Sequence, residues 1–401
     1  GPGGAMPSGG PPGGGGAPPG GANGLPSGAG GTAAGGQMVS NGDLALAAGY
    51  VVVSPGARGR DNVTSSGRYY GKAPAAIVDL KAAVRYVRSN KGRIPGNTDR
   101  IVSSGSSAGG ALSALLGASG DSPMYDAYLK QIGAADASDA IFASGDWCPI
   151  TDLDHADMAY EWTFGSLATS GAGSVDRAVS RQLAGGYGDY LASLKLTGTG
   201  GFGALTAGTY SNYLLKTFLE PSATRYLTAL PAAARASYLA RNPWITWSGG
   251  AATFTFAKFV AHVGRLKGAP AFDGFTLTSP ETIEFGDETT NARHFTLYSL
   301  RHGSGNAGAQ LDSDLPTKIN LMNPMYFIGQ RNASRARNWW IRVGTSDTDT
   351  SPAIVGNLAT SLENLGDNVN ALMYWDAGHG ANEDAPDFIT WIGKITGYPA
   401  R

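Results

Sequence analysis

The sequence predicts an α/β fold in which a parallel sheet carries helices on both faces and a large segment is inserted between two halves of the sheet. Strand and helix patterns alternate from Leu44 to about residue 151, and they alternate again from about residue 336 to the end of the chain. A G-x-S-x-G pattern at 105–109 lies between a predicted strand and a predicted helix. An Asp and a His follow in late loops of the second half.

The first half contains short β-branched strands and helices with regular apolar spacing. Residues 50–53 are a β-branched run that ends at Ser-Pro-Gly, which is typical of a buried parallel strand. The next helix follows Pro74, and its apolar residues recur at helical spacing: Ile77, Leu80, Val84 and Val87. Beyond it we predict a strand at 100–103, a helix from Ala108 that includes 111–117, and a strand at 140–143.

Two strand–helix units close the chain, with strands at 339–343 and 369–375 and helices at 352–365 and from 384 to about 395. The region before them has aromatic helical pieces (213–219 and 251–266) and polar loops around Asp287 and Gly303. Because the sheet pattern resumes afterwards, we interpret 152–335 as an inserted lid rather than an independent module. The α/β core is therefore predicted to consist of residues 37–151 and 336–401.

Residues 1–36 differ from the rest of the chain in composition. They contain 17 Gly and 7 Pro and no charged residue, and the first charge in the chain is Asp43. Such a segment cannot bury enough apolar surface to offset the entropy of ordering it, so we expect a largely mobile surface loop. The glycines follow no fixed period, which excludes a collagen-like helix.

Composition excludes several classes of function. The 30 basic and 31 acidic residues nearly cancel, so nothing points to nucleic acid or an anionic membrane, and no apolar stretch is long enough to span a bilayer. Cys148 is the only cysteine, which excludes an intrachain disulfide and a Cys-rich zinc site, and we expect neither a metal nor a cofactor. No export signal is recognisable at the start. The compartment stays unassigned, with a slight preference for a secreted or periplasmic location.

Ser107 is the candidate nucleophile. With 60 Gly in 401 residues, about one chance match to G-x-S-x-G is expected, so the flanking elements decide the interpretation. A strand precedes Ser107, a small-residue helix follows it, and its neighbours are all small, as the tight nucleophile elbow of an α/β-hydrolase requires. Such an elbow points the backbone N–H of Ala108 at a developing oxyanion.

A serine nucleophile needs a base, and the base needs an orienting carboxylate. In this fold they follow the serine in the order Asp, then His. His379 lies between glycines in a loop after the last predicted strand, where a general base belongs. The acid follows the previous strand, and the pattern leaves Asp347 and Asp349 open, although Asp349 also suits the N-cap of the following helix.

The second oxyanion donor usually comes from a glycine-rich loop after an earlier strand. The stretch GPGGAMP at 1–7 fits such a loop, through the backbone N–H of Gly4 or Ala5, and a tag remnant or disordered tail is the alternative. If it is the loop, the strands that normally precede it are missing from this chain. We then expect a separate N-terminal fragment, released by processing or on another chain, to complete the sheet.

The sequence resembles the bacterial tannases (tannin acyl hydrolases) of the lactobacillus type from about residue 44 onward. The stretches that carry the resemblance are GYVVVSPGARGRDN (49–62), GKAPAAIVDLKAAVRYVRSNKGRIPG (71–96), SGSSAGGALS (104–113), CPITDLDHADMAYEW (148–162) and RVGTSDTDTS (342–351). The fungal tannase and feruloyl esterase group is less similar, because it has cysteines where this chain has Ser106 and Gly380.

This resemblance implies a Ser107–Asp347–His379 triad that hydrolyses galloyl esters. It also implies that Lys267 and Glu281 of the lid, with Asp349 beside the triad, hold the three galloyl hydroxyls. Phenol hydroxyls donate well to carboxylates, and a lysine ammonium donates to phenol oxygens, so such a site would reject esters that lack these hydroxyls. Without the resemblance, Lys267 and Glu281 would be interpreted as a solvated lid surface.

Other functions stay open on the sequence alone. The nearest alternative is a feruloyl or other aryl esterase on the same scaffold, for which the substrate is still a small phenolic ester. A peptidase with a cap lacks an evident charged pocket for a peptide. A non-catalytic binding protein that uses the Gly/Pro-rich segment is a further alternative, and the order Ser, Asp, His argues against it.

Overall fold

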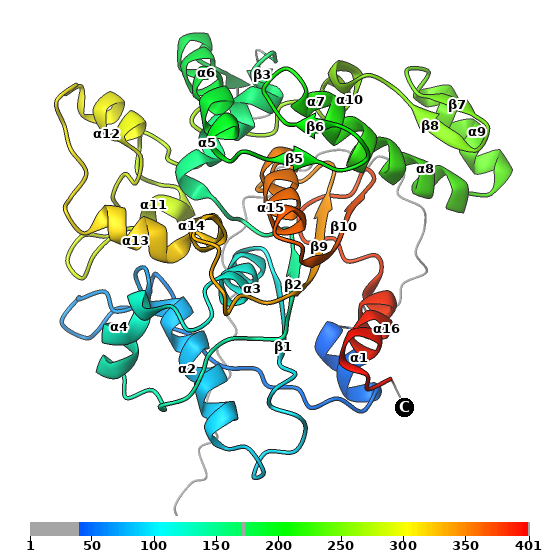
Figure 1. Cartoon of the computed structure of the whole chain (residues 1–401). Helices are drawn as coiled ribbons and strands as arrows, with labels where there is room; N and C mark the ends of the chain where they lie inside the picture. Colours follow the sequence, from blue (N-terminus) through cyan, green and yellow to red (C-terminus); the bar gives the residue numbers. More distant parts are fainter. Residues whose placement is uncertain (1–39, 168, 171–172, 400–401) are drawn as a thin grey trace, which may run out of the picture. The chain divides into compact units, whose positions relative to one another are not determined.

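A four-stranded parallel sheet forms the centre of the computed structural model, which describes residues 40–167, 169–170 and 173–399 (Figure 1). Its strands lie in the order β1-β2-β9-β10. Their bounds are β1 (Val102–Ser106), β2 (Ala143–Trp147), β9 (Asn338–Gly344) and β10 (Asn368–Tyr374). In register, Ala143 lies opposite Val102 and Asn338, and Asn338 lies opposite Asn368. The parallel α/β class predicted from the sequence is confirmed.

Helices account for most of the remaining elements. Those of the core are α1 (Asn41–Ala47), α2 (Ala75–Ser89), α3 (Ala108–Ala118), η1 (Pro123–Tyr125, a 3₁₀-helix), α4 (Asp126–Gln131), α15 (Pro352–Asn364) and α16 (Ala385–Thr396). No helix in the part of the chain that the structure describes is long and apolar enough to cross a membrane.

The segment between the two halves contains short helices and three two-stranded ribbons. Its helices are α5 (Leu153–Phe164), α6 (Arg177–Ser193), α7 (Tyr210–Leu214), η2 (Leu215–Leu219, a π-helix), α8 (Glu220–Ala229), α9 (Ala232–Arg241), α10 (Phe256–Val263), α11 (Pro280–Glu284), α12 (Leu297–Ser304), α13 (Leu315–Met322) and α14 (Pro324–Gly329). The ribbons pair β3 (Thr169–Ser170) with β4 (Gly173–Ser174), β5 (Thr197–Gly198) with β6 (Gly203–Ala204), and β7 (Thr246–Ser248) with β8 (Ala251–Thr253).

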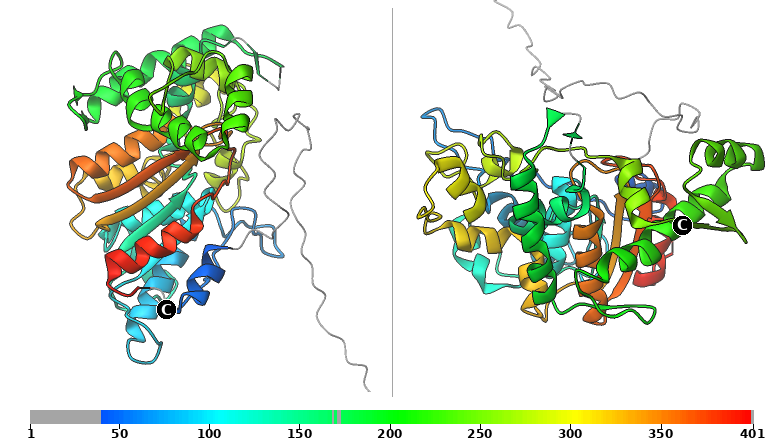
Figure 2. Two further views of the ribbon diagram at one scale, coloured as in Figure 1. Left: turned by 90° about the vertical axis from the view of Figure 1, so that its right-hand side faces the viewer. Right: turned by 90° about the horizontal axis from the view of Figure 1, so that it is seen from above.

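Helices cover both faces of the sheet because successive side chains of a strand point to opposite sides. Trp339 and its neighbour Trp340 show this directly: Trp339 packs under Gly117 of α3, whereas Trp340 packs against Phe388 of α16. At Gly117 an added Cβ would lie 2.6 Å from the Trp339 ring, so only glycine lets α3 approach. Figure 2 shows α15 and α16 on opposite sides of the strands.

The inserted segment lies over the end of the sheet to which the strands point (Figure 1). Ser222 and Arg225 of α8 both donate hydrogen bonds to the carbonyl of Met373, near the carboxyl end of β10 (2.7 and 2.9 Å). Ligands of open parallel sheets bind at this carboxyl end. The segment is therefore placed to cover a site there, although the boundaries at 151/152 and 335/336 stay a prediction.

Several elements differ from the sequence prediction. Residues 50–53 form no strand, and Val51 and Val53 are about half exposed (48% and 52%). A β-branched run forms a strand only where a neighbouring strand accepts its hydrogen bonds, and no described strand lies beyond β1. The helix expected from Ala251 begins at Phe256, because residues 251–253 pair in a ribbon, and Gly303 lies in α12 rather than in a loop.

Asp146 is a fully buried carboxyl group beneath α3, and it predicts a pH-dependent stability. It accepts a hydrogen bond from Ser144 (2.6 Å), its second oxygen has no partner among the described residues, and burial raises its pKa to about 7. Burial favours the protonated form of Asp146 in the folded protein. The contribution of this carboxyl group to the free energy of unfolding is therefore full below about pH 4 and is lost as the pH rises through 7. Each unit of pKa shift corresponds to about 1.4 kcal/mol.

We therefore expect Asp146→Asn, which mimics the neutral acid, to have a melting temperature close to wild type at about pH 4 and clearly above it at pH 8. Thermal unfolding across this pH range measures the difference between the two proteins. Other buried acids titrate in both proteins and cancel. A difference in melting temperature that does not change with pH would show that Asp146 carries no such linkage.

Candidate active site

Ser107 occupies the sharp turn between β1 and α3. Its backbone lies at φ 63° and ψ −124°, a conformation that costs a non-glycine residue on the order of 1–3 kcal/mol. A backbone hydrogen bond stabilises this strained conformation: the Ser107 N–H donates to the carbonyl of Trp147 in the adjacent strand (3.0 Å). The turn lifts the side chain away from the sheet at its carboxyl end, as the elbow pattern predicted.

Two glycines make this turn possible. A Cβ on Gly105 would lie 2.1 Å from the carbonyl oxygen of Gly109, and one on Gly110 would lie 2.2 Å from that of Trp147. Gly109 itself faces open space. The tight positions are therefore Gly105, which lets the chain fold back on itself, and Gly110, which lets α3 lie against β2.

His379 and Asp347 lie beside Ser107, although both are distant from it in the sequence. The His379 ring joins the two: its Nε2 is 2.7 Å from the Ser107 Oγ, and its Nδ1 is 2.9 and 3.0 Å from the Asp347 oxygens. Asp347 follows β9 and His379 follows β10, so neighbouring parallel strands deliver both to one edge. The arrangement is that of a nucleophile, a base and an orienting acid.

The geometry separates the two aspartates that the sequence left open. Asp347 is buried, and its Oδ1 also accepts the backbone N–H groups of Asp349 (2.7 Å) and Thr350 (2.8 Å). Asp349 lies farther from the ring, with 3.9 Å between its Oδ2 and the His379 Nδ1. Its other oxygen contacts Lys267 Nζ at 2.6 Å instead. Ser351, not Asp349, caps α15, by accepting the N–H of Ile354.

Residues of the inserted segment fix the loop that carries His379. Asp376, three residues before the histidine, accepts a hydrogen bond from Tyr238 (2.5 Å) and lies 2.7 Å from Nε2 of His262. Trp375 donates its indole N–H to the same Tyr238 oxygen (2.7 Å). The loop that leads to His379 is thus hydrogen-bonded to the inserted segment.

Two consecutive residues of α5 position Lys267. The hydroxyl oxygen of Tyr160 accepts the backbone N–H groups of Leu266 (2.9 Å) and Lys267 (2.7 Å). The next residue, Glu161, forms a buried ion pair with Arg265. Both residues therefore hold the turn that presents the lysine. This function of α5 was not predicted from the sequence.

Glu281 lies close enough to Lys267 and Asp349 for their charges to act on it. Its side chain is buried, and its Oε2 accepts no hydrogen bond from any described residue. Burial raises the pKa of Glu281, the charge of Lys267 lowers it and the charge of Asp349 raises it. For Asp349, burial is the largest effect and raises the pKa, but Lys267 brings it below the ordinary value. The three residues therefore form a polar patch with one unsatisfied acceptor.

The electrostatics of His379 suit a base held by a carboxylate. The hydrogen bond to Asp347 is the largest effect and raises the pKa of His379, and the contact with Cys148 acts in the same direction, whereas burial opposes both. A neutral imidazole with such partners is a strong proton acceptor.

The predicted oxyanion donors fall partly outside the structure. Ala108 begins α3, so its N–H lies in the first turn, where no intrahelical acceptor exists, directly beside Ser107. Gly4 and Ala5, together with the whole predicted loop 1–36, lie outside the described residues.

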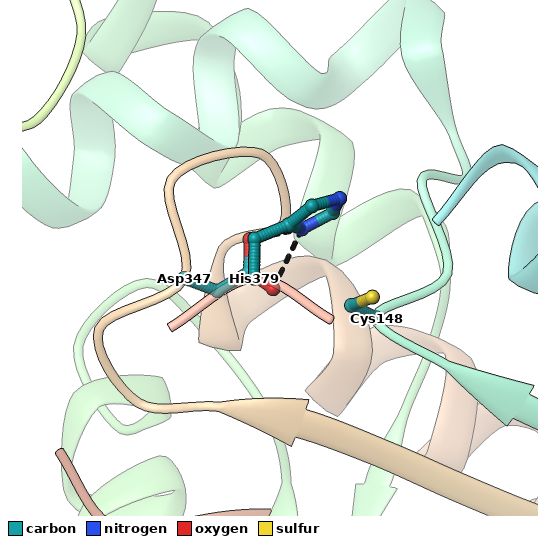
Figure 3. Close-up of side chains that lie close together, drawn as sticks. All are labelled: Cys148, Asp347 and His379. Atoms are coloured by element: carbon teal, nitrogen blue, oxygen red, sulfur yellow. Dashed lines mark hydrogen bonds and ion pairs between the residues drawn. The ribbon is translucent and has the colours of Figure 1, made fainter. Parts of the chain in front are cut away.

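Cys148 is the residue near this site that sequence reasoning did not assign. It follows β2 directly, and its thiol is buried beside His379 and Asp347 (Figure 3). Little in the sequence pointed to it, because the predicted strand ended at residue 143, whereas β2 ends at Trp147, directly before Cys148, and so brings it to the carboxyl edge of the sheet.

Comparison of the sequence with known families and proteins points to esterases. The family model described as BD-FAE matches residues 30–174. The Mycobacterium tuberculosis protein Esterase LipC is 37% identical over 76 residues, which are 18% of this chain and 19% of that protein. The stretch in common thus spans about a fifth of the curated relative.

Solved structures give a more extensive match. The Fusobacterium nucleatum tannase is 36% identical with a TM-score of 0.79, over 88% of this chain and 79% of that one. The tannin acyl hydrolase of Lactobacillus plantarum is 37% identical with a TM-score of 0.79, over 88% of this chain and 78% of that one. One structure similar to this chain, also 37% identical, is that of a tannin acyl hydrolase in complex with ethyl gallate.

Proposed function

Because the chain belongs to the bacterial tannase family, we propose that it is a serine esterase that hydrolyses galloyl esters of tannins and simple gallates. The observation that carries the proposal is the position of Asp349. This carboxylate pairs with Lys267 of the inserted segment at 2.6 Å and also stands 3.9 Å from the His379 ring. Groups suited to phenol hydroxyls therefore adjoin a hydrolytic triad.

The first half of the reaction forms an acyl-enzyme. Ser107 Oγ attacks the ester carbonyl while His379 Nε2, 2.7 Å away, takes the hydroxyl proton. Asp347 holds the imidazole by its Nδ1–H and stabilises the imidazolium that forms. His379 then gives the proton to the leaving alcohol, and the galloyl group remains on Ser107.

The second half repeats these steps with water. His379 removes a proton from water, the hydroxide attacks the acyl carbonyl, and the proton returns to Ser107 as gallic acid leaves. In both halves the oxyanion is stabilised by the N–H of Ala108, with Gly4 or Ala5 as the proposed second donor. None of these steps needs a cofactor.

Recognition of the galloyl ring is assigned to Lys267, Glu281 and Asp349. The unpartnered Oε2 of Glu281 is a buried acceptor that a phenol hydroxyl can satisfy. Asp349 accepts a second hydroxyl, and Lys267 donates to the phenol oxygens. A buried acceptor left empty costs about 1–3 kcal/mol, so an ester without hydroxyls binds at a disadvantage.

We also propose that further strands complete the sheet beside β1. The support is that β1 has a strand neighbour on one side only within the described residues, and that the apolar residues Val51 and Val53 are exposed. Whether these strands come from a separate N-terminal fragment is answered by intact mass spectrometry of the purified protein, which resolves any second polypeptide.

The test of the galloyl assignment compares methyl gallate with methyl benzoate, which has the same ring without hydroxyls. We expect Lys267→Met and Glu281→Gln each to lower kcat/KM for methyl gallate by about 10- to 100-fold, because each loses a charged hydrogen-bond partner. Turnover of methyl benzoate should stay within about threefold of wild type, because that ring makes no such bonds.

Lys258→Met is the matched control, because Lys258 is an exposed lysine on α10 of the same inserted segment. It should leave both substrates unchanged. A feruloyl or general aryl esterase instead predicts equal effects of each variant on both substrates. Faster turnover of methyl ferulate than of methyl gallate by wild type would replace the tannase assignment and keep the fold.

A further inference from the structure

Cys148 places a thiol within the active site without a role in ester hydrolysis. Its Sγ, a ring nitrogen of His379 and a carboxylate oxygen of Asp347 all lie within 4.8 Å of one another (Figure 3). The backbone of Cys148 is itself left-handed (φ 38°), and its N–H donates to the carbonyl of Arg342 (2.6 Å), which fixes the residue between β2 and β9.

Besides His379, the thiol contacts Ser106 Oγ at 3.5 Å, which is a weak interaction for both atoms. Burial raises the pKa of the thiol, but the contacts with His379 and Ser106 outweigh it, and the pKa ends below its ordinary value. A thiol of this kind yields a thiolate more readily than an isolated buried cysteine.

Sulfur, imidazole nitrogen and carboxylate oxygen are the ligand set of tetrahedral Zn²⁺ and its softer relatives such as Cd²⁺. Bonds of about 2.0–2.3 Å place the ligand atoms of a tetrahedral ion about 3.3–3.8 Å apart. Donors that already lie within 4.8 Å reach that spacing by small side-chain rotations. The His379 side chain is partly exposed (24%), so an ion in solvent can reach the ring.

We propose that the Cys148 thiolate and the His379 imidazole bind a soft divalent cation, with Asp347 as a third ligand, and that this ion inhibits the enzyme. Binding releases the thiol proton to solvent, so affinity falls as the pH is lowered. A histidine nitrogen that is coordinated to the ion cannot accept the proton of Ser107. The binding stands on geometry alone, whereas the inhibition rests on the proposed function.

A second acidic cluster shows why the thiol matters. Asp152, Asp154 and His155 also have ligand atoms within 4.8 Å of one another. There, however, Asn323 donates to both carboxylates (3.0 and 2.9 Å), and Tyr190 donates to Asp152. What this cluster lacks is a soft donor, so it serves as the control.

The binding test titrates Cd²⁺ alone into the full chain and records thiolate-to-metal charge-transfer absorption. We expect saturation near one equivalent in wild type, in Ser107→Ala and in Asp154→Asn, and no band in Cys148→Ala. Cys148→Ser, which is closer in size, substitutes if the alanine variant does not fold. Absence of the band in wild type, or its persistence in a folded Cys148 variant, overturns the proposal.

The inhibition test measures methyl gallate hydrolysis under the same titration. Saturating Cd²⁺ should lower the wild-type rate at least about tenfold, reversibly with a chelator, and the Cys148 variants should need at least about tenfold more Cd²⁺, since they lose one ligand. Equal sensitivity of wild type and variant overturns the inhibitory role. Because the band is read in inactive Ser107→Ala as well, failure of the proposed esterase activity is distinguished from failure of metal binding.

Discussion

Ser107→Ala is expected to lower kcat for methyl gallate by about 10⁴- to 10⁶-fold. The nucleophile and its base act as one unit, so removing the nucleophile abolishes nearly all of the rate enhancement that the triad provides. The residual rate reflects oxyanion stabilisation and binding alone. The alanine fits the same turn, since the strain at φ 63° is held by the backbone bond to Trp147 and not by the hydroxyl. The measurement is single-turnover and steady-state hydrolysis with the purified variant.

Ser106→Ala is the matched control, because it removes the neighbouring hydroxyl, whose hydrogen-bond contact is a weak one with Cys148 at 3.5 Å. It should keep at least about a third of wild-type activity, since a weak hydrogen bond is worth little. A phosphonate probe should label wild type and Ser106→Ala on Ser107 and should not label Ser107→Ala. Substantial activity of Ser107→Ala, or labelling elsewhere, would remove Ser107 as the nucleophile.

The helices could be predicted more closely than the strands. α2 carries apolar residues at regular spacing, and its predicted position agrees with Ala75–Ser89. β1 and β2 contain VSSGS and ASGDW, sequences without an apolar run, so the sequence located them two to four residues too early. Residues 50–53 show the reverse error: the composition suits a strand, but a strand also requires a hydrogen-bonding neighbour.

The sequence predicted where the site lies but not all of the residues that form it. Ser107 and His379 follow from the elbow pattern and from the order of the late loops. The sequence could not distinguish Asp347 from Asp349, because two residues of spacing in a loop leave both within reach, and only the turn that buries Asp347 decides it. Contacts between distant segments, such as Tyr160 with Lys267 or Tyr238 with Asp376, have no local signature.

Asp347→Asn should lower kcat by about 10⁴-fold. The amide can donate to Nδ1, which stabilises the wrong tautomer of His379, and without a negative charge it does not stabilise the imidazolium that forms during the reaction. Asp349→Asn is the natural comparison, since it makes the same chemical change two residues away. There we expect methyl benzoate hydrolysis within a few-fold of wild type and methyl gallate hydrolysis about 10- to 100-fold lower, because the neutral amide loses the ion pair with Lys267 and a charged acceptor for the ring.

The pH profile separates a catalytic loss at Asp347 from a merely structural one. Asp347 is the largest cause of the raised pKa of His379, and the protonated imidazole cannot accept the Ser107 proton. The activity of wild type should therefore rise with pH through the pKa of His379. In Asp347→Asn, this rising limb of the pH–activity curve should move to lower pH. A misfolded variant would lose activity without moving the limb. Comparable losses in Asp347→Asn and Asp349→Asn on methyl benzoate would assign the orienting acid differently.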